Sequence, residues 1–88
     1  MWKYMIDDFL LKKIIKSHID SEELKKIEIT NETLLLEDLL FDSIKFIQLV
    51  IDLEETFDVI INDLDIVKYN KYSQLSKYLQ ELKESKDE

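Results

Sequence analysis

Apolar residues recur along the chain at the spacing of helices rather than of strands. Near the N-terminus they follow a period close to 3.6, which predicts a helix over about Lys3 to His18. The stripe consists of Ile6, Phe9, Leu10, Lys13 and Ile14. Lysines gather toward the end of this helix, where cations complement the helix dipole. We expect His18 to be solvated there, because no second ligand or base stands near it in the sequence.

The pattern loosens between residues 20 and 42, which predicts a long, partly ordered loop. Ser21 is a suitable cap for a short helical turn at its start. A connection of this length is unusual in a compact domain unless side chains anchor it. The expected anchors are Ile27, Ile29, Leu34, Leu36 and Leu39.

A second helix is predicted over roughly Ser43 to Phe57. Its core face, within about 60° of Phe46 on a helical wheel, carries Phe46, Leu49, Val50, Leu53 and Phe57. A second apolar strip lies about 100–160° away and consists of Ile44, Ile47 and Ile51, bordered by Gln48, Asp52, Glu54 and Glu55. The strip either docks partner proteins or packs on a neighbouring helix. For Ile47 alone the two interpretations are equally good, whereas the position of the strip next to Ser43 favours docking for Ile44 and Ile51.

The remaining residues predict two further helices. Asn62 is a plausible cap for one turn over Asp63 to Val67, and apolar spacing predicts a last helix over Ser73 to Glu84. The fold class is therefore all-α, a four-helix bundle with a long loop between the first two helices and a short third helix. We expect one domain over residues 1–88, with a core of about 3–84 and a frayed tail at 85–88.

Composition removes several classes of chemistry. The chain has no glycine, proline or cysteine and only one histidine. Glycine-dependent nucleotide and hydrolase motifs are therefore excluded, and neither a disulfide nor a usual zinc site can form. We expect no metal and no catalytic residues, since the many carboxylates occupy solvated helical faces.

Charge is distributed unevenly. Residues 1–19, 20–66 and 67–88 carry +2, −11 and +1, which gives the net charge of −8. Such an acidic middle repels nucleic acid and attracts basic protein surfaces. Neither a signal-type cleavage site nor a stretch of membrane-spanning length is visible. We expect a cytoplasmic monomer that binds neither nucleic acid nor membrane.

One serine, in the stretch "LLFDSIKFIQLV", calls for an explanation. Asp42 or Ser43 can cap the second helix by accepting a hydrogen bond from an amide of its first turn. Serine hydrolysis needs a base within hydrogen-bond reach and a turn that binds the oxyanion, and the sequence around Ser43 offers neither. A third role is a tether, because free amides and the positive end of the dipole at a helix N-terminus stabilise a phosphodiester on Ser43.

The stretch "FDSIKFIQLVIDLEETFDV" resembles the prosthetic-group site and second helix of the acyl and peptidyl carrier proteins. Asp42, Ser43 and Ile44 stand where these carriers have Asp-Ser-Leu or Asp-Ser-Ile. The segments "LEETFDVII", "YNKYSQLSKYLQEL" and "TNETLLLEDLLFDS" are also similar, so that the likeness covers roughly residues 28–84. It implies the four-helix fold of the acyl carrier proteins.

The resemblance also implies a function without catalysis. Ser43 would receive 4'-phosphopantetheine from coenzyme A, and the terminal thiol of this group would hold acyl or aminoacyl groups as thioesters. Asp42 would assist docking of the phosphopantetheinyl transferase. The partner-facing positions would be Ile44, Ile47, Gln48, Ile51, Glu54 and Glu55. The other partners would be a loading enzyme, either adenylating or an acyltransferase, and downstream synthases or condensing enzymes.

Two departures from the carrier pattern stand out. Carriers usually have glycine shortly before the Asp-Ser pair, where this chain has Leu40 and Phe41, and Asn62 replaces their usual proline. "DSIKFIQL" is similar to the peptidyl carriers of nonribosomal peptide synthetases, whereas "LEETFDV" looks more like free-standing acyl carriers. This mixture favours a discrete carrier of a specialised peptide or polyketide-like pathway over one of fatty acid synthesis. The alternative from another class is a helical interaction module in which Ser43 is only a cap.

Overall fold

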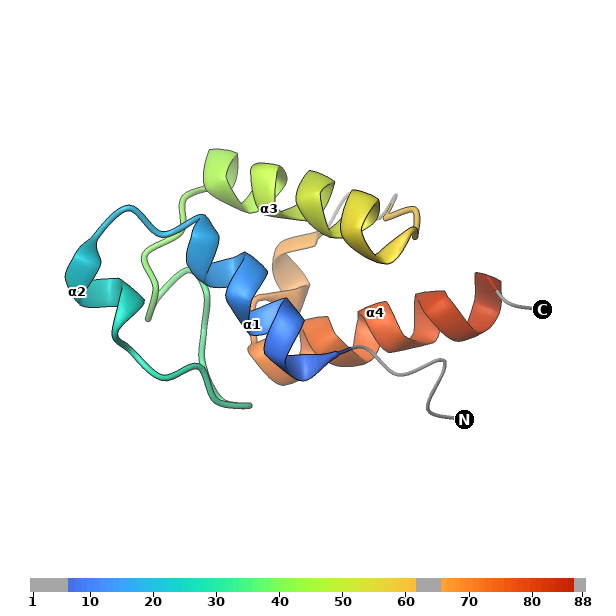
Figure 1. The fold of residues 1–88 in the computed structure, drawn as a ribbon, viewed down its shortest axis with the longest axis horizontal. Helices are drawn as coiled ribbons and strands as arrows, with labels where there is room; N and C mark the ends of the chain where they lie inside the picture. The colour runs from blue at the N-terminus through green and yellow to red at the C-terminus, as the bar shows by residue number, and fades with distance from the viewer. Residues whose placement is uncertain (1–6, 62–65, 87–88) are drawn as a thin grey trace.

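The computed structural model describes residues 7–61 and 66–86. Within these residues, α-helices and one 3-10 helix follow one another without a β-strand (Figure 1). Their bounds are α1 Asp8–Ser17, α2 Glu22–Lys25, α3 Ser43–Phe57, η2 Ile66–Tyr69 and α4 Tyr72–Lys86. The predicted all-α fold is therefore confirmed, including the long connection before α3. None of the helices in this part of the chain is long and apolar enough to cross a membrane.

Helix α1 begins where a carboxylate caps it. The Asp7 side chain accepts a hydrogen bond from the Leu10 amide at 3.2 Å, which satisfies one donor of the first turn. The helix ends after Ser17, one residue before the predicted end at His18. The predicted start at Lys3 and the predicted stripe residue Ile6 lie outside the described residues.

The rotation of α1 differs from the predicted one. Leu11, Ile14 and Ile15 are buried against the rest of the protein, whereas Phe9 is 76% exposed and Lys13 is also exposed. The predicted stripe was thus wrong at these two positions. Apolar residues at 9, 10, 11, 14 and 15 surround most of the helix, so their spacing alone does not determine which side faces the core. Packing against α3 decides it.

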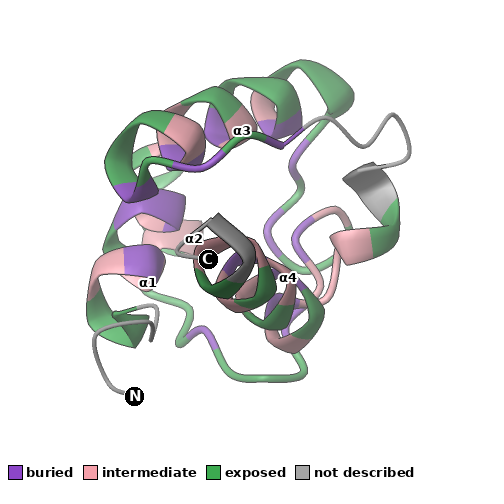
Figure 2. Cartoon of the chain, turned by 90° about the vertical axis from the view of Figure 1, so that its right-hand side faces the viewer, coloured by how far each residue is buried: buried purple, intermediate pink, exposed green. Residues whose placement is uncertain are grey.

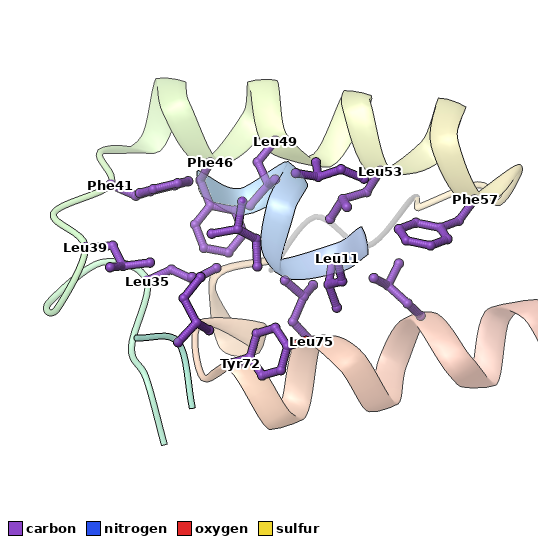
Figure 3. Packing of buried hydrophobic residues seen from close by; sticks show 14 of the residues in the cluster. Leu11, Leu35, Leu39, Phe41, Phe46, Leu49, Leu53, Phe57, Tyr72 and Leu75 are labelled. Carbon is purple, nitrogen blue, oxygen red and sulfur yellow. The ribbon is translucent and has the colours of Figure 1, made fainter. Parts of the chain in front are cut away.

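Helix α3 has the predicted bounds and supplies much of the core. Its predicted core face is confirmed, since Phe46, Leu49, Leu53 and Phe57 are buried and Val50 packs against the cluster partly buried. Figure 3 shows these rings and leucines pointing into the space between α3 and α4, toward Tyr72 and Leu75. Burial of each such side chain stabilises the fold by about 1.5–3 kcal/mol.

The loop that precedes α3 is held by the beginning of α4. The first amides of α4 lack acceptors in their own helix, and carbonyl groups of the loop replace them. The Tyr72 amide donates to Thr33 O at 2.8 Å, and the Ser73 amide donates to Asn31 O at 3.2 Å. Just before α4, Asn70 accepts the Leu36 amide on Oδ1 at 2.7 Å. The loop is therefore ordered by main-chain hydrogen bonds as well as by apolar anchors.

The apolar anchors of this loop agree with the prediction in part. Ile29 and Leu39 are buried, and Leu36 packs half-buried against the core. Ile27 is 37% exposed and is not an anchor. Leu35, which the prediction did not include, is completely buried. Three consecutive leucines at 34–36 do not indicate by themselves which one points inward. The hydrogen bonds from the Leu35 and Leu36 amides to Asn70 fix that choice. The predicted cap Ser21 is confirmed, since its side chain accepts the Leu24 amide.

The C-terminal part also deviates slightly from the prediction. Asn62 and most of the predicted turn over 63–67 lie outside the described residues, and η2 extends to Tyr69. Helix α4 begins one residue earlier than predicted, at Tyr72, and continues to Lys86 into the predicted tail. Lys83 donates from Nζ to Phe57 O at 2.9 Å, which ties α4 to the negatively polarised end of α3.

A hydrogen bond between side chains joins the beginnings of α1 and α4. The Tyr72 hydroxyl donates to an Asp8 carboxylate oxygen, and Lys12 Nζ lies 3.1 Å from the other Asp8 oxygen. The bond from Tyr72, together with Lys12, lowers the pKa of Asp8 below its ordinary value of 3.8. Burial of Tyr72, followed by its hydrogen bond to Asp8 and then by the charge of Asp8, raises the pKa of Tyr72. The pair is thus strongest with Asp8 ionised and Tyr72 neutral.

This pair predicts a loss of stability in acid. The pKa of Asp8 is lower in the folded protein than in the unfolded chain. The stabilisation that the Asp8 carboxylate gives is therefore complete above the pKa of the unfolded chain, and it is lost as the pH falls through the pKa of the folded protein. We expect Tyr72→Phe to lower the free energy of unfolding by about 1 kcal/mol near neutral pH, after allowance for the exposure of Asp8, and by less at about pH 3. Urea unfolding of both proteins at the two pH values measures this. The Asp8→Asn variant is the control, and an equal loss at both pH values would contradict the assignment.

Candidate functional site

The segment that leads into α3 alternates buried and exposed side chains. Leu39 and Phe41 are buried, and Leu40 between them is 66% exposed. Leu40 has a φ of 58°, in the left-handed region that residues with a β-carbon avoid at a cost of about 1–2 kcal/mol. The two buried neighbours hold it in this conformation. The turn that carriers usually make with glycine is therefore made here by a leucine.

Asp42 is the residue that caps α3. Its Oδ1 accepts the Lys45 amide at 2.8 Å, and its carbonyl accepts the Phe46 amide at 2.9 Å. Its backbone is extended, as the cap position requires. Of the two capping candidates in the sequence, Asp42 therefore caps the helix and Ser43 does not.

Ser43 is the first residue of α3 and is exposed. Among the described residues none forms a hydrogen bond with its hydroxyl group. The amides of Ser43 and Ile44 belong to the first turn and have no acceptor within the helix. The site thus combines an accessible hydroxyl group, free amide donors and the positive end of a helix dipole.

The outward side of α3 carries the predicted apolar strip. Ile44, Ile47 and Ile51 are 66%, 55% and 50% exposed, and exposed residues run along the outer side of the helix in Figure 2. Ile47 therefore does not fill a groove against another helix. The strip starts one residue after Ser43 and continues along the helix for two turns.

The polar residues around this strip differ in what they contact. Gln48 and Glu55 are exposed. Glu54 is half-buried, and its Oε2 accepts the Ile61 amide at 2.7 Å, so that one of its oxygens helps to hold the segment after α3. Asp52 accepts the Thr56 hydroxyl group at 3.3 Å.

His18 contradicts the expectation of a solvated residue. Its Nε2 lies 3.0 Å from Asp52 Oδ2 and its side chain is 19% exposed. The pair connects the end of α1 to the middle of α3. Sequence reasoning missed it because the two residues are 34 positions apart and no local pattern links them.

A second long-range pair lies close to Ser43. Lys45 Nζ is 2.7 Å from Asp20 Oδ2, and this contact lowers the pKa of Asp20 below its ordinary value. Lys45 belongs to the first turn of α3, whereas Asp20 follows α1. The pair therefore holds the α1–α2 connection beside the candidate attachment site. The carboxylate of Asp20 also offsets the charge of Lys45, the one cation in the first turn of α3.

These observations define a class of protein, a small helical domain with an exposed serine at the head of an amphipathic helix. The comparison with known families agrees with this class. The family described as the phosphopantetheine attachment site matches residues 15–79, which is more than half of the chain. The chain therefore belongs to this family. A search of curated proteins returns no significant match.

Membership in the family establishes the general role. The chain is a carrier protein whose prosthetic group, 4'-phosphopantetheine, is attached covalently, and it is not an enzyme. Carriers of this kind interact with transferases and synthase enzymes. The alternative interpretation as an interaction module without a prosthetic group is therefore set aside.

The conformation of Leu40 predicts an unusual response to glycine. In most positions a protein with glycine is less stable than one with alanine by about 0.5–1 kcal/mol, because glycine gives the unfolded chain more conformational entropy to lose on folding. At a positive φ the order reverses. We expect Leu40→Gly to be more stable than Leu40→Ala by about 0.5–1 kcal/mol. Urea unfolding of both variants measures the difference, and greater stability of the alanine variant would refute the left-handed turn.

Proposed function

We propose that Ser43 is the residue that carries the 4'-phosphopantetheine group. The observation that supports this most is the division of roles at the start of α3, where Asp42 caps the helix and leaves the Ser43 hydroxyl group exposed. A serine that capped the helix would have its oxygen engaged with an amide. Ser43 is instead available for attachment.

The surroundings of Ser43 suit a phosphodiester. The unpaired amides of the first turn and the helix dipole stabilise a negative charge at this end of α3. Because Lys45 is paired with Asp20, the backbone supplies much of this stabilisation. The bound group contributes a terminal thiol that forms thioesters with acyl or aminoacyl cargo, and the protein contributes position and exposure.

The strip of Ile44, Ile47 and Ile51 is proposed as the surface that docks partner enzymes. Exposed isoleucines beside the proposed attachment point, flanked by Gln48 and Glu55, offer modest apolar area with a polar and partly acidic border. Such a border speeds encounter with basic enzyme surfaces. Glu54 contributes charge to it in spite of its bond to Ile61, and Asp42 assists the transferase.

The pathway is proposed from the residues of the first turns of α3. Lys45 and Gln48 stand where fatty acid carriers more often have acidic groups, and the same residues are similar to those of peptidyl carriers. This favours a discrete carrier in a nonribosomal peptide or polyketide-like pathway. An adenylating enzyme or an acyltransferase would load such a carrier, and a condensing enzyme would unload it. A carrier of fatty acid synthesis is the alternative, supported by the acidity of "LEETFDV".

The attachment site is tested by mass spectrometry of the intact protein after incubation with coenzyme A, magnesium and a broad-specificity phosphopantetheinyl transferase. We expect the wild type to gain one phosphopantetheine group and Ser43→Ala to gain none. The matched control is Ser21→Ala, which removes another serine at a helix start and leaves loading unchanged. Ser43→Ala should remain within about 0.5 kcal/mol of wild-type stability, because Ser43 caps nothing. Modification of Ser43→Ala would refute the assignment.

The docking surface is tested by the rate of the same reaction. Ile47→Ser removes exposed apolar area from the centre of the strip, and we expect kcat/KM for the carrier substrate to fall by about tenfold. The free energy of unfolding should change by less than about 0.5 kcal/mol because the side chain is exposed. Ile27→Ser changes an exposed isoleucine outside the strip and should leave the rate unaltered. Equal rates for Ile47→Ser and wild type would exclude Ile47 from the interface with this transferase.

A further inference from the structure

A basic, apolar-lined hollow lies on the surface of α1, away from the candidate attachment site. It is an open hollow with a volume of about 490 Å³, lined by α1 and the segment that follows α2. Phe9 provides most of its exposed apolar surface, the buried Ile29 lies at its base, and Lys12, Lys13, Lys16 and Lys26 also line it. Glu28 is the one acidic residue in this lining. A concentration of cations of this kind is unexpected in a protein with a net charge of −8.

The hollow uses the side of α1 that the core leaves free. Phe9, Lys12, Lys13 and Lys16 are spaced at i, i+3, i+4 and i+7, which places them on one face of a helix. The buried residues Leu11, Ile14 and Ile15 occupy the remaining face. Phe9 is 76% exposed, although a phenylalanine of this size is more stable when buried. The face is thus both apolar and positively charged, and nothing in the described fold covers it.

Most of the lysines around the hollow are available to a ligand. Lys12 is paired with Asp8 at 3.1 Å. For Lys13, Lys16 and Lys26, no ion pair is formed with any of the described residues. Three ammonium groups therefore surround an apolar surface without a carboxylate to offset them, apart from Glu28 on the rim.

We propose that this hollow is a second docking site, which binds an acidic segment of a partner protein through one large apolar side chain flanked by carboxylates. The apolar side chain would pack against the exposed Phe9, over the buried Ile29, and the carboxylates would meet Lys13, Lys16 and Lys26. This arrangement follows from complementarity of charge and of apolar surface. A hollow of this size accommodates one or two side chains rather than a whole helix.

The net charge favours a short acidic segment over an extended anionic surface. Salt at physiological concentration limits the range of an electrostatic interaction at the surface to about 8 Å. A peptide in the hollow is therefore influenced chiefly by the surrounding lysines. A membrane or a nucleic acid extends much farther and would also meet the acidic residues of the 20–66 region, which carries a net −11. These carboxylates would repel it.

The hollow and the isoleucine strip of α3 are different surfaces. Helix α1 packs on α3 through its buried face, and the hollow lies on its other face, next to the segment after α2. In Figure 1, α1 lies between α3 and that segment. An acidic partner on α1 would therefore leave Ser43 and the strip accessible. The carrier could be held by one protein while its α3 surface meets another.

The test is an NMR titration of the 15N-labelled protein with a synthetic peptide of about ten residues, in which one phenylalanine and one leucine are flanked by glutamates. The protein carries no prosthetic group in this experiment, so the result does not depend on the proposed role of Ser43. We expect amide shifts to change at residues 9–16 and 26–29. Raising the salt from about 0.05 M to about 0.5 M should weaken binding.

Three protein variants and a second peptide test whether binding depends on both the lysines and the apolar surface. Lys13→Glu and Phe9→Ser should each weaken binding by about fivefold or more, since one reverses a charge and the other removes apolar area. Lys77→Glu makes the same charge change at an exposed position of α4 and should leave binding within about twofold of wild type. A peptide with serine in place of both apolar residues should bind at least fivefold more weakly, on the order of 1 kcal/mol.

Four outcomes would overturn the proposal. Equal weakening by Lys77→Glu, or equal affinity for the serine peptide, would reduce the interaction to general charge attraction. Cosedimentation of the wild type, but not of Lys13→Glu, with phosphatidylglycerol vesicles in the absence of any peptide binding would identify a membrane as the ligand. Shifts at residues 9–16 that depend on the concentration of the free protein would identify a second copy of the chain. Well-dispersed amide spectra of all variants ensure that a loss of binding is not a loss of fold.

Discussion

The position of Ser43 depends on how the chain enters α3. Two buried side chains, Leu39 and Phe41, fix the segment on both sides of Leu40, which adopts a left-handed conformation although it is not glycine. Asp42 then caps the helix. Because the cap is a side chain of the preceding residue, the next residue begins the helix with its own side chain free. Anchoring, turn and cap together therefore place one hydroxyl group at the positive end of α3.

This entry is stable only because the loop before it is itself held. Loop carbonyls accept the first amides of α4, and Asn70 bonds the main chain of the loop beside the buried Leu35. The amides of α4 would otherwise lack acceptors, so the same bonds complete that helix and order the loop. At the other end of α3, Lys83 of α4 donates to Phe57. Both ends of the helix that carries the candidate site are thus connected to α4, directly or through the loop.

Local sequence patterns predicted the helix bounds and the exposure of the candidate site residues well. The bounds of α3, its core face and its exposed isoleucine strip all follow from the apolar spacing, and Ser43 follows from its position before that helix. Features that depend on tertiary contact did not follow. The rotation of α1 left Phe9 outside, and His18 pairs with Asp52, because contacts between distant segments decide these positions. The capping ambiguity between Asp42 and Ser43 also needed coordinates, since both residue types cap helices equally well.

The acidity of the chain has two separate uses. Several carboxylates bind main-chain amides, namely Asp7, Asp38, Asp42 and Glu54, which accept the amides of Leu10, Leu34, Lys45 and Ile61. In a chain without glycine or proline, such bonds fix the helix ends and turns. These groups contribute to the field that attracts basic partners, but their positions are determined by the fold. Exposed carboxylates without such a bond, such as Glu55, are the ones free to adjust to a partner. The net charge of −8 therefore does not indicate how many carboxylates are free to move at the proposed docking surface.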